Sequence, residues 1–258
     1  MPKLGLGTKT TNSGLITPGI VADSLVLKHN YNAGSVMPLS DGAAFFDGSN
    51  DWISVAASSS LHHVDTVSKF TATCWVKHDT GSPSNNETII AKYDTGANKR
   101  EWRISADASD RIIVYVSDNG TNTMNAYSSY VLADTKWHHI AFTYDGSVGT
   151  ANQRCTIYVD GVDYGETVSG TLPTAVNEDD AVLSIGAFTN SGGSAEEWGG
   201  YLCNAGVWSR ALTQAEIKSI MWKNYSGLTS SEKTNLVSWW NLSSDANDSH
   251  GSNNGTLS

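Results

Sequence analysis

The stretch WHHIAFTYDG, residues 137–146, alternates with a period of two and ends in an Asp-Gly turn signal. One face of such a strand carries His138, Ile140, Phe142 and Tyr144, and the other carries Trp137, His139, Ala141 and Thr143. Adjacent histidines on a strand point to opposite faces, so these two cannot ligate one metal ion together. We therefore predict a core strand in which both histidines are structural and bind no metal, against the alternative of a ligand or catalytic role.

The same alternation recurs along most of the chain. FTATCWVKH (70–78) places Phe70, Ala72, Cys74 and Val76 on one face. Further strands are expected within residues 43–55, 87–93, 101–107, 110–120, 154–168, 181–188 and 201–209. The segment 154–168 is predicted to be a hairpin with a type I′ turn at Asp160-Gly161. This succession of short strands predicts an all-β protein.

One helix interrupts the strands. In LTQAEIKSIM, Thr213 and Glu216 have the spacing of a capping box, which predicts a short capped helix near 213–222. Thr229 and Glu232 repeat that spacing and predict a second helical turn. These are structural devices and carry no functional signal.

Composition excludes several classes of function. The 258 residues carry a formal net charge of −10, and no basic cluster suited to phosphate binding occurs, so we expect no nucleic-acid partner. No apolar run reaches membrane-spanning length, and the first residues lack the apolar core of a secretory signal. Cys74, Cys155 and Cys203 lie in strand-like runs, which favours buried free thiols and folding in a reducing cytoplasm.

The ordered set of FFDGSNDWISV, FTATCWVKH, WHHIAFTYDG, IYVDGV, LSIGAF and WGGYLCNAGVWSRALTQAEIKSIM resembles a known family. It is similar to the laminin G-like and pentraxin-like modules of the concanavalin A-like lectin superfamily, over residues 23–222. The resemblance implies a two-sheet antiparallel jelly-roll sandwich. It also implies that WHH opens a core strand, in agreement with the alternation.

The resemblance does not imply an enzyme. Glucanases of the superfamily use a Glu-x-Asp-x-Glu strand, and glycoside hydrolysis normally requires two carboxylates flanking the scissile bond. That spacing is absent, and the consecutive acids Glu178, Asp179 and Asp180 favour a solvated loop. We therefore expect no catalytic residue and no enzymatic activity.

Calcium is disfavoured on similar grounds. The places that the resemblance gives to carboxylate ligands here carry Lys99, Arg100, Ala187, Phe188, Thr189, Cys203 and Asn204. We therefore expect no cofactor. Asp47 and Asp51 are the candidates for a structural ion, although two solvated turn acids fit FDGSND better.

A sugar-binding site without calcium would need an exposed aromatic ring beside polar groups. Trp198, in a Gly-rich loop beside Glu196 and Glu197, is the candidate for such a site. A tryptophan that caps the edge of the sandwich is the interpretation that we favour over such a site.

The two ends of the chain differ from the middle. Residues 1–22 are rich in Gly and Thr and are interpreted as an extended arm that binds another protein chain. Residues 223–258 are interpreted as a helical turn followed by a strand or tail, which either joins its own sheet or reaches a neighbour. Together with the free cysteines, these ends make the chain similar to structural proteins of tailed phages.

The leading hypothesis is therefore a non-enzymatic virion protein, either a capsid decoration or a tail or fibre component. Its expected partners are other virion proteins and copies of itself, with glycans on a host surface as further partners. The first alternative is a carbohydrate-binding lectin or receptor-binding module, and a secreted location is the alternative to the virion. A glycoside hydrolase of the same fold has the least support.

Overall fold

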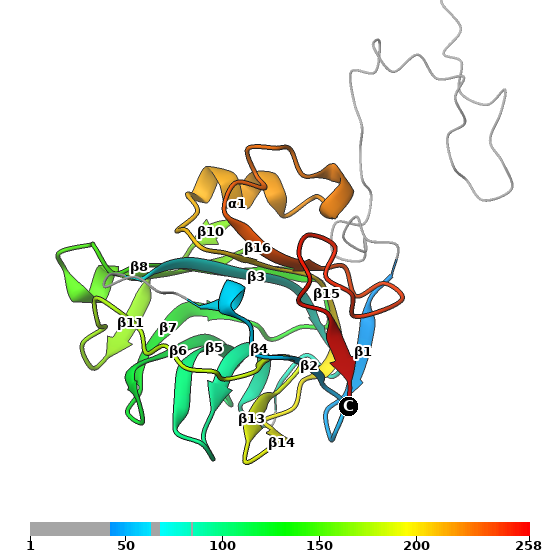
Figure 1. Ribbon diagram of the computed structural model, residues 1–258, viewed down its shortest axis with the longest axis horizontal. Helices are drawn as coiled ribbons and strands as arrows, with labels where there is room; N and C mark the ends of the chain where they lie inside the picture. The colour runs from blue at the N-terminus through cyan, green and yellow to red at the C-terminus, as the bar shows by residue number, and fades with distance from the viewer. Residues whose placement is uncertain (1–41, 63–67, 84) are drawn as a thin grey trace, which may run out of the picture. The chain divides into compact units, whose positions relative to one another are not determined.

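A computed structural model describes residues 42–62, 68–83 and 85–258. These residues form two β-sheets that pack face to face, with one short α-helix outside one sheet (Figure 1). Neighbouring strands are antiparallel except for a one-residue parallel contact between β13 and β4. The predicted all-β sandwich is confirmed, while the expected arm at 1–22 lies outside the described residues.

The first sheet has seven strands in the order β1-β15-β3-β8-β9-β10, with β16 beside β15. β1 pairs with residues 199–202 of β15 and β16 with residues 205–208, so the two short strands share one edge of β15. The strands of this sheet are β1 (Ala44–Asp47), β3 (Lys69–His78), β8 (His138–Asp145), β9 (Cys155–Val159), β10 (Val162–Asp163), β15 (Gly199–Trp208) and β16 (Leu236–Trp240).

The second sheet has ten strands in the order β11-β7-β6-β5-β4-β12-β2-β17, with β13 beside β4 and β14 beside β13. Its strands are β2 (Ile53–Val55), β4 (Glu87–Asp94), β5 (Lys99–Ala106), β6 (Arg111–Gly120), β7 (Met124–Val131), β11 (Glu166–Ser169), β12 (Leu183–Ile185), β13 (Phe188–Asn190), β14 (Gly193–Ala195) and β17 (Gly255–Leu257). The remaining short elements of the described residues are the 3-10 helices η2 (Ser59–Leu61), η3 (Ala151–Gln153) and η4 (Tyr225–Gly227).

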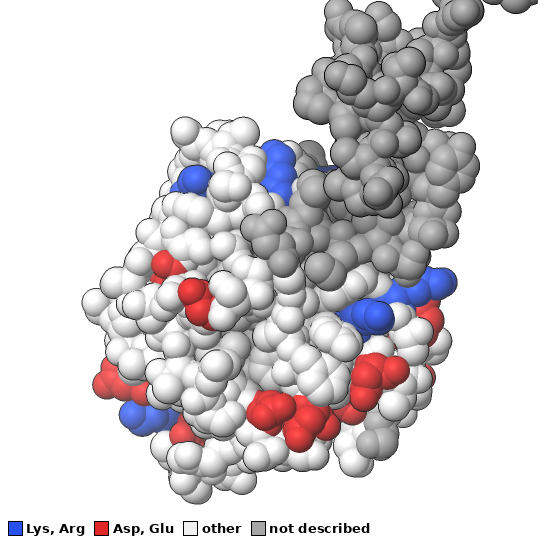
Figure 2. Space-filling view, turned by 90° about the vertical axis from the view of Figure 1, so that its right-hand side faces the viewer, with Lys and Arg blue, Asp and Glu red and all other residues white. Residues whose placement is uncertain are grey.

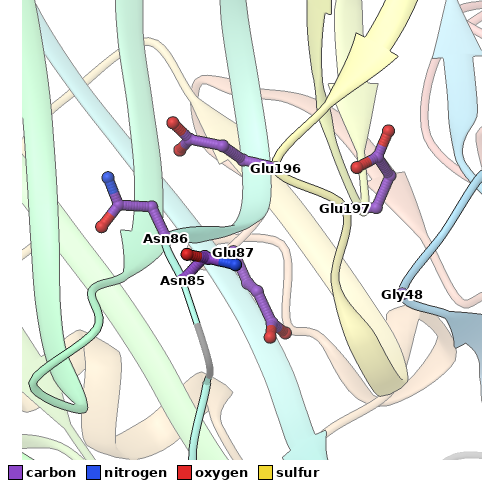
Figure 3. Close-up of a pocket in the computed structure, with 6 residues that line it drawn as sticks. All are labelled: Gly48, Asn85, Asn86, Glu87, Glu196 and Glu197. Carbon is purple, nitrogen blue, oxygen red and sulfur yellow. The ribbon is translucent and has the colours of Figure 1, made fainter.

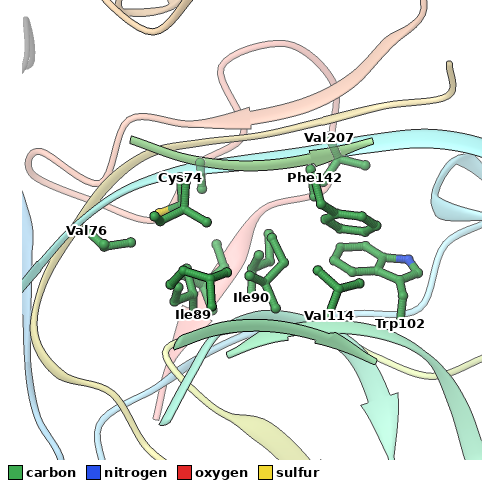
Figure 4. Close-up of a cluster of buried hydrophobic side chains, with 14 of the residues drawn as sticks. Cys74, Val76, Ile89, Ile90, Trp102, Val114, Phe142 and Val207 are labelled. Atoms are coloured by element: carbon green, nitrogen blue, oxygen red, sulfur yellow. The ribbon is translucent and has the colours of Figure 1, made fainter. Parts of the chain in front are cut away.

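The core lies between the two sheets because each strand turns one face inward. Cys74, Val76, Phe142 and Val207 of the seven-stranded sheet face Ile89, Ile90, Trp102 and Val114 of the ten-stranded sheet (Figure 4). The predicted inward face of β3 is confirmed, since all four of its residues belong to this core. Each buried side chain of this size stabilises the fold by roughly 1.5–3 kcal/mol.

The helix α1 (Gln214–Ile220) begins at the predicted cap. Thr213 Oγ1 accepts a hydrogen bond from the Glu216 N–H, and Glu216 Oε2 accepts one from the Thr213 N–H at 2.8 Å. The second predicted box has the same pair of bonds between Thr229 and Glu232, within a turn. No described helix is long and apolar enough to cross a membrane.

The helix covers part of the outer face of the seven-stranded sheet. Leu212, Ile217 and Ile220 pack on Trp208 and Trp239 in a second apolar cluster, separate from the core between the sheets. Both tryptophans belong to strands at one half of the sheet, β15 and β16. Among the described residues, this cluster includes none from β1 or from the first half of β15.

The C-terminal segment belongs to the sandwich. β16 pairs with β15 in one sheet, and β17 pairs with β2 in the other. The Trp240 indole N–H donates to the Asn253 carbonyl at 2.8 Å, which ties the loop between the two strands to the core. Of the two alternatives for this segment, the structure therefore shows pairing within the same chain.

Candidate functional site

His138 and His139 lie on opposite faces of β8, as their spacing predicts. His138 Nδ1 lies 2.8 Å from Asp160 Oδ2, and its Nε2 lies 3.0 Å from Asp134 Oδ1. His139 lies on the outer face, where its ring centroid is 5.5 Å from that of Trp75. The pair therefore joins a turn and a neighbouring strand to β8.

The two neighbours titrate differently for a physical reason. Burial works against protonation of His138, but the hydrogen bonds and negative charges of Asp160 and Asp134 outweigh it and raise its pKa. Burial dominates for His139 and lowers its pKa to about 4, against the smaller opposing effect of Asp160.

Trp198 does not form the exposed platform that the sequence suggests. Its side chain is 0% exposed and belongs to the core between the sheets. The ring meets that of His78 edge-on, at a centroid distance of 5.4 Å. The expectation of an exposed ring is wrong because the apolar side chain turns inward just before β15 begins.

The two glutamates beside Trp198 do reach a solvent-accessible cavity. Glu196 and Glu197 line a pocket of about 470 Å³ together with Glu87, Asn85, Asn86 and Gly48. Figure 3 shows the two glutamates diverging from one loop, with Asn85, Asn86 and Glu87 on the segment that enters β4. The volume is within the range of small-molecule sites, but the lining is mostly polar.

Glu87 is held in place by two hydrogen bonds. Its Oε2 atom lies 3.0 Å from His78 Nε2 and accepts a bond from the Gly199 N–H at 2.9 Å. The Gly81 N–H donates to His78 Nδ1 at 3.0 Å, so Nδ1 is the acceptor and Nε2 carries the proton toward Glu87. His78 is buried, and it therefore fixes this carboxylate from behind.

Glu196 is held by a buried arginine. Arg103 Nη1 donates to Glu196 Oε2 at 2.7 Å, and the guanidinium carbon lies 3.9 Å from the ring centroid of Tyr115. Phe188 and Tyr93 contact the same guanidinium at 4.6 and 5.0 Å. These rings restrict Arg103 to one position, and Arg103 in turn fixes the carboxylate.

The remaining polar side chains of the pocket are less restrained. Asn86 Nδ2 donates to the Tyr115 hydroxyl at 3.3 Å. Among the described residues, no hydrogen bond or ion pair involves the side chains of Asn85 or Glu197. The pocket therefore combines two fixed carboxylates with polar groups that can bind a ligand.

The other acidic candidates have local roles. Asp47 Oδ1 accepts hydrogen bonds from the Ser49 and Asn50 N–H groups, and Asp51 Oδ2 accepts one from the Asp47 N–H. Both carboxylates thus stabilise the turn between β1 and β2. Within residues 42–62, 68–83 and 85–258, no group of three or more His, Cys, Asp or Glu side chains is arranged to hold a metal ion.

The sequence pointed to only part of this site. Glu87, Asn85 and Asn86 were missed, because a carboxylate at the start of an expected strand looks like any solvated turn residue. Their one signal is the run SNNE, which places three polar side chains just before an apolar strand. Figure 2 shows many Asp and Glu side chains on the side of the molecule that carries β1 and the C-terminus, in keeping with the net charge of −10.

Two antiparallel sheets packed face to face in this order form a lectin-like fold. The chain belongs to the concanavalin A-like lectin/glucanases superfamily, since the family model of that description matches residues 47–218. The search of curated proteins gives no match.

Solved structures of the same fold agree with this assignment. A protein from Bacteroides ovatus, provisionally named as carbohydrate-binding, has 20% identity and a TM-score of 0.63, over 86% of this chain and 58% of its own length. The CBM40 domain of the Ruminococcus gnavus IT-sialidase, bound to α2,3-sialyllactose, has 11% identity and a TM-score of 0.50, over 71% of this chain and 100% of that domain. At these identities the likeness shows a shared fold.

Proposed function

We propose that this sandwich is a non-enzymatic carbohydrate-binding module and that the pocket around Glu197 is its binding site. The observation that carries the proposal is the lining: three carboxylate residues and two carboxamide residues line one cavity. Carboxylates accept hydrogen bonds from hydroxyl groups, and carboxamides both donate and accept them. A ligand that carries many hydroxyl groups on a compact ring, such as a sugar, matches this set.

Preorganisation supports the proposal. Glu87 and Glu196 are fixed by His78 and Arg103, which lie behind the pocket wall and are both buried. Little side-chain freedom is then lost when a ligand binds, so more of the interaction energy remains as affinity.

The same contacts favour binding over hydrolysis. A glycosidase needs one carboxyl group that is free to donate a proton and a second that attacks or activates water. Glu196 is instead ion-paired with Arg103, and Glu87 accepts two hydrogen bonds. We therefore propose that the chain has no hydrolytic activity. We also propose that ligand binding requires no calcium.

A glycan array of short oligosaccharides, followed by calorimetry, tests the proposal. We expect Glu197→Gln to weaken binding by about tenfold or more, because a charge-assisted hydrogen bond to a hydroxyl is lost. Asp118→Asn is the matched control, because Asp118 is exposed and lies on β6 close to Gly120. Gly120 pairs with Arg100 near the start of β5, whereas Glu87 pairs with Ala106 at the other end of that strand. Equal affinity in both variants would contradict the assignment of the pocket. Release of reducing ends, or loss of binding in EDTA, would contradict the non-enzymatic or calcium-free part.

Display on a phage virion is a second proposed role, compatible with the first. The observation that favours it is that Cys74 and Cys155 are free thiols and that all three cysteines, Cys203 included, are buried, as expected for a protein folded in a reducing cytoplasm. Co-expression with the products of adjacent genes tests this role. The full chain should co-purify with a particle-forming protein, and a variant lacking residues 2–20 should stay folded but no longer attach. Attachment without these residues would contradict a role for the arm.

A further inference from the structure

Aromatic side chains form a row across the outer face of the seven-stranded sheet. Phe45 of β1 pairs with Tyr201 of β15, and Tyr201 pairs with Lys77 of β3. Val76 of β3 pairs with His138 of β8, and the two strands are antiparallel. The residue after Val76, Lys77, therefore lies opposite the residue before His138, Trp137. We name Phe45, Tyr201, Lys77 and Trp137 the aromatic row.

The row lies on the outer face and is partly open to solvent. Lys77 alternates with Val76, which belongs to the core, and Phe45 alternates with the core residue Phe46. Phe45 is 51% exposed and Tyr201 is 37% exposed. Exposed aromatic groups that adjoin one another indicate a binding surface more often than isolated ones do.

Contacts within the row hold the rings in a fixed arrangement. The ring centroids of Phe45 and Tyr201 lie 5.0 Å apart, and those of Tyr201 and Trp137 lie 6.3 Å apart. The Lys77 ammonium lies 5.5 Å from the Tyr201 centroid. Strand pairing sets the spacing of these side chains, so the surface needs little rearrangement to bind a ligand.

The cover of the sheet ends beside the row. Trp75, two residues before Lys77 on the same face, is buried, and its indole N–H donates to the Met221 carbonyl just after α1. The ring of Trp222 lies tilted against that of Trp75, at a centroid distance of 5.5 Å, and Trp222 is itself 52% exposed. The end of the helix thus covers Trp75, while in the part of the chain that the structure describes Phe45 and Tyr201 remain exposed.

On the other side, the row is bordered by carboxylates. Asp47 lies two residues after Phe45, and Asp79 lies two residues after Lys77; both are exposed. Along each strand, the row is therefore one residue deep: acidic groups lie on one side of it, and Trp75, with the exposed Trp222 against it, lies on the other.

We propose that the aromatic row is a second carbohydrate-binding surface, which stacks successive sugar rings of a polysaccharide. Sugar rings present apolar C–H faces to aromatic rings, while their edges carry hydroxyl groups for Lys77, Asp47 and Asp79. A specific protein interface covers about 800 Å² per partner and excludes charges from its centre. A narrow band with a lysine in the middle and carboxylates along one edge fits a linear chain of sugars better.

This inference rests on the proposed function in one respect, because it takes the ligand to be a carbohydrate. It uses none of the residues of the pocket, and the two surfaces make separate predictions. The pocket is a cavity of about 470 Å³ and suits a short glycan, whereas the row extends across β1, β15 and β3 to the residue before β8 and suits a polymer.

Affinity electrophoresis in gels that contain laminarin, alginate, xyloglucan or dextran tests the inference on the full chain. We expect at least one polymer to retard the protein, and Tyr201→Ala or Trp137→Ala to weaken the retardation by about tenfold. The matched control is Tyr164→Ala, because Tyr164 is 46% exposed and stacks on Tyr130 at 5.0 Å outside the row. Far-UV circular dichroism confirms folding of each variant, and Phe45→Ser replaces any variant that fails to fold.

The outcomes separate the two proposals. The inference is overturned if none of the four polymers retards the protein, or if the row variants are retarded as strongly as the wild type. In either case, short-glycan binding that Glu197→Gln weakens would still support the pocket. Loss of retardation in the row variants alone, with Glu197→Gln equal to the wild type in both assays, supports the row and contradicts the pocket. A wild-type dimer that Tyr201→Ala dissociates in sedimentation also overturns the inference, since the row would then bind a second copy of the chain.

Discussion

The two outer faces of the sandwich are protected from water by different means. On the seven-stranded sheet, an apolar cluster of helix and turn residues covers Trp208 and Trp239. On the ten-stranded sheet, Tyr93, Ala91 and Phe188 form a small outer cluster around a buried cation, Arg103. One face is covered by a separate element, and the other by side chains of its own strands and of the β13 segment.

The difference shows where binding surfaces arise on this fold. The apolar cover stabilises the sheet by burial but ends at Trp222, and the aromatic row lies just beyond that end. The Arg103 cluster instead holds a charged side chain that fixes Glu196 at the pocket. The first face thus leaves an apolar surface open, and the second positions a polar one.

Among changes at the two outer faces, the largest effect is expected from removing an anchor of the helical cover. Ile217→Ala should lower the free energy of unfolding by about 2–5 kcal/mol, because Ile217 is 0% exposed and its loss leaves a cavity against the sheet. Lys218→Ala, at the exposed neighbouring position, should change it by about 0.5 kcal/mol or less. Urea denaturation measures both. A loss below 1 kcal/mol for Ile217→Ala would show that the sheet does not depend on this cover.

The next effect is a pH dependence that originates beneath the same face. Burial holds the pKa of His139 at about 4, below its ordinary value of 6.5. Between these two values the unfolded chain binds a proton that the folded chain does not, so stability is full above about pH 6.5 and falls by about 3 kcal/mol toward pH 4. His139→Gln should remove that loss in denaturation curves recorded at pH 7, 5.5 and 4.

The neighbouring histidine supplies the matched control. Its pKa is raised by Asp160 and Asp134, so His138 stabilises the fold below about pH 6.5 and loses that contribution as pH rises through its folded pKa. His138→Gln should therefore make the acid loss steeper, where His139→Gln makes it shallower. Identical pH profiles for the two variants would contradict the assignment of opposite environments to the two faces of β8.

Alternation predicted much of the fold, because burial on one side of a strand leaves a period of two in the sequence. The inward faces of β3 and β8 and the Asp160-Gly161 turn were predictable in this way, and the positive φ angles of 51° and 73° at that turn confirm it. β7 was missed, because MNAYSSYV is polar and only partly buried. The pairing of β17 with β2 brings together residues that are far apart in the chain, and no local pattern encodes it.

The candidate site was less predictable for a related reason. Exposure of a single loop tryptophan depends on which way the loop turns, and Trp198 turns inward. Glu196 was predicted as a site residue, yet its partner Arg103 lies 93 positions away in the chain, on β5. Likewise, the aromatic row is visible only once the register of β1, β15 and β3 is known.

A smaller effect is expected from the cation on the ten-stranded sheet. Arg103→Met keeps an apolar side chain between Tyr115 and Phe188 but removes the charge that pairs with Glu196, and should lower stability by about 1–2 kcal/mol. Arg111→Met is the control, because Arg111 lies 4.6 Å from the Tyr127 ring with its side chain 41% exposed, and should lower stability by less than about 1 kcal/mol. Equal losses would show that enclosure by aromatic rings adds nothing at Arg103.

A larger fall in short-glycan affinity for Arg103→Met than for Arg111→Met would link the cluster to the pocket.

The smallest effect on stability is expected in the aromatic row itself. Tyr201→Ser should lower the free energy of unfolding by less than about 1 kcal/mol, because the ring is already 37% exposed and leaves no cavity when it is removed. Phe142→Ala, in the core on the other side of the same sheet, should lower it by about 3–5 kcal/mol, since Phe142 is 0% exposed. Urea denaturation of both variants sets the scale.

If Tyr201→Ser lowered the free energy of unfolding by more than 2 kcal/mol, the row would be an uncovered part of the fold's own packing. A loss below 1 kcal/mol means that folding does not require this exposed ring, which leaves ligand binding as the role that the retardation assay measures.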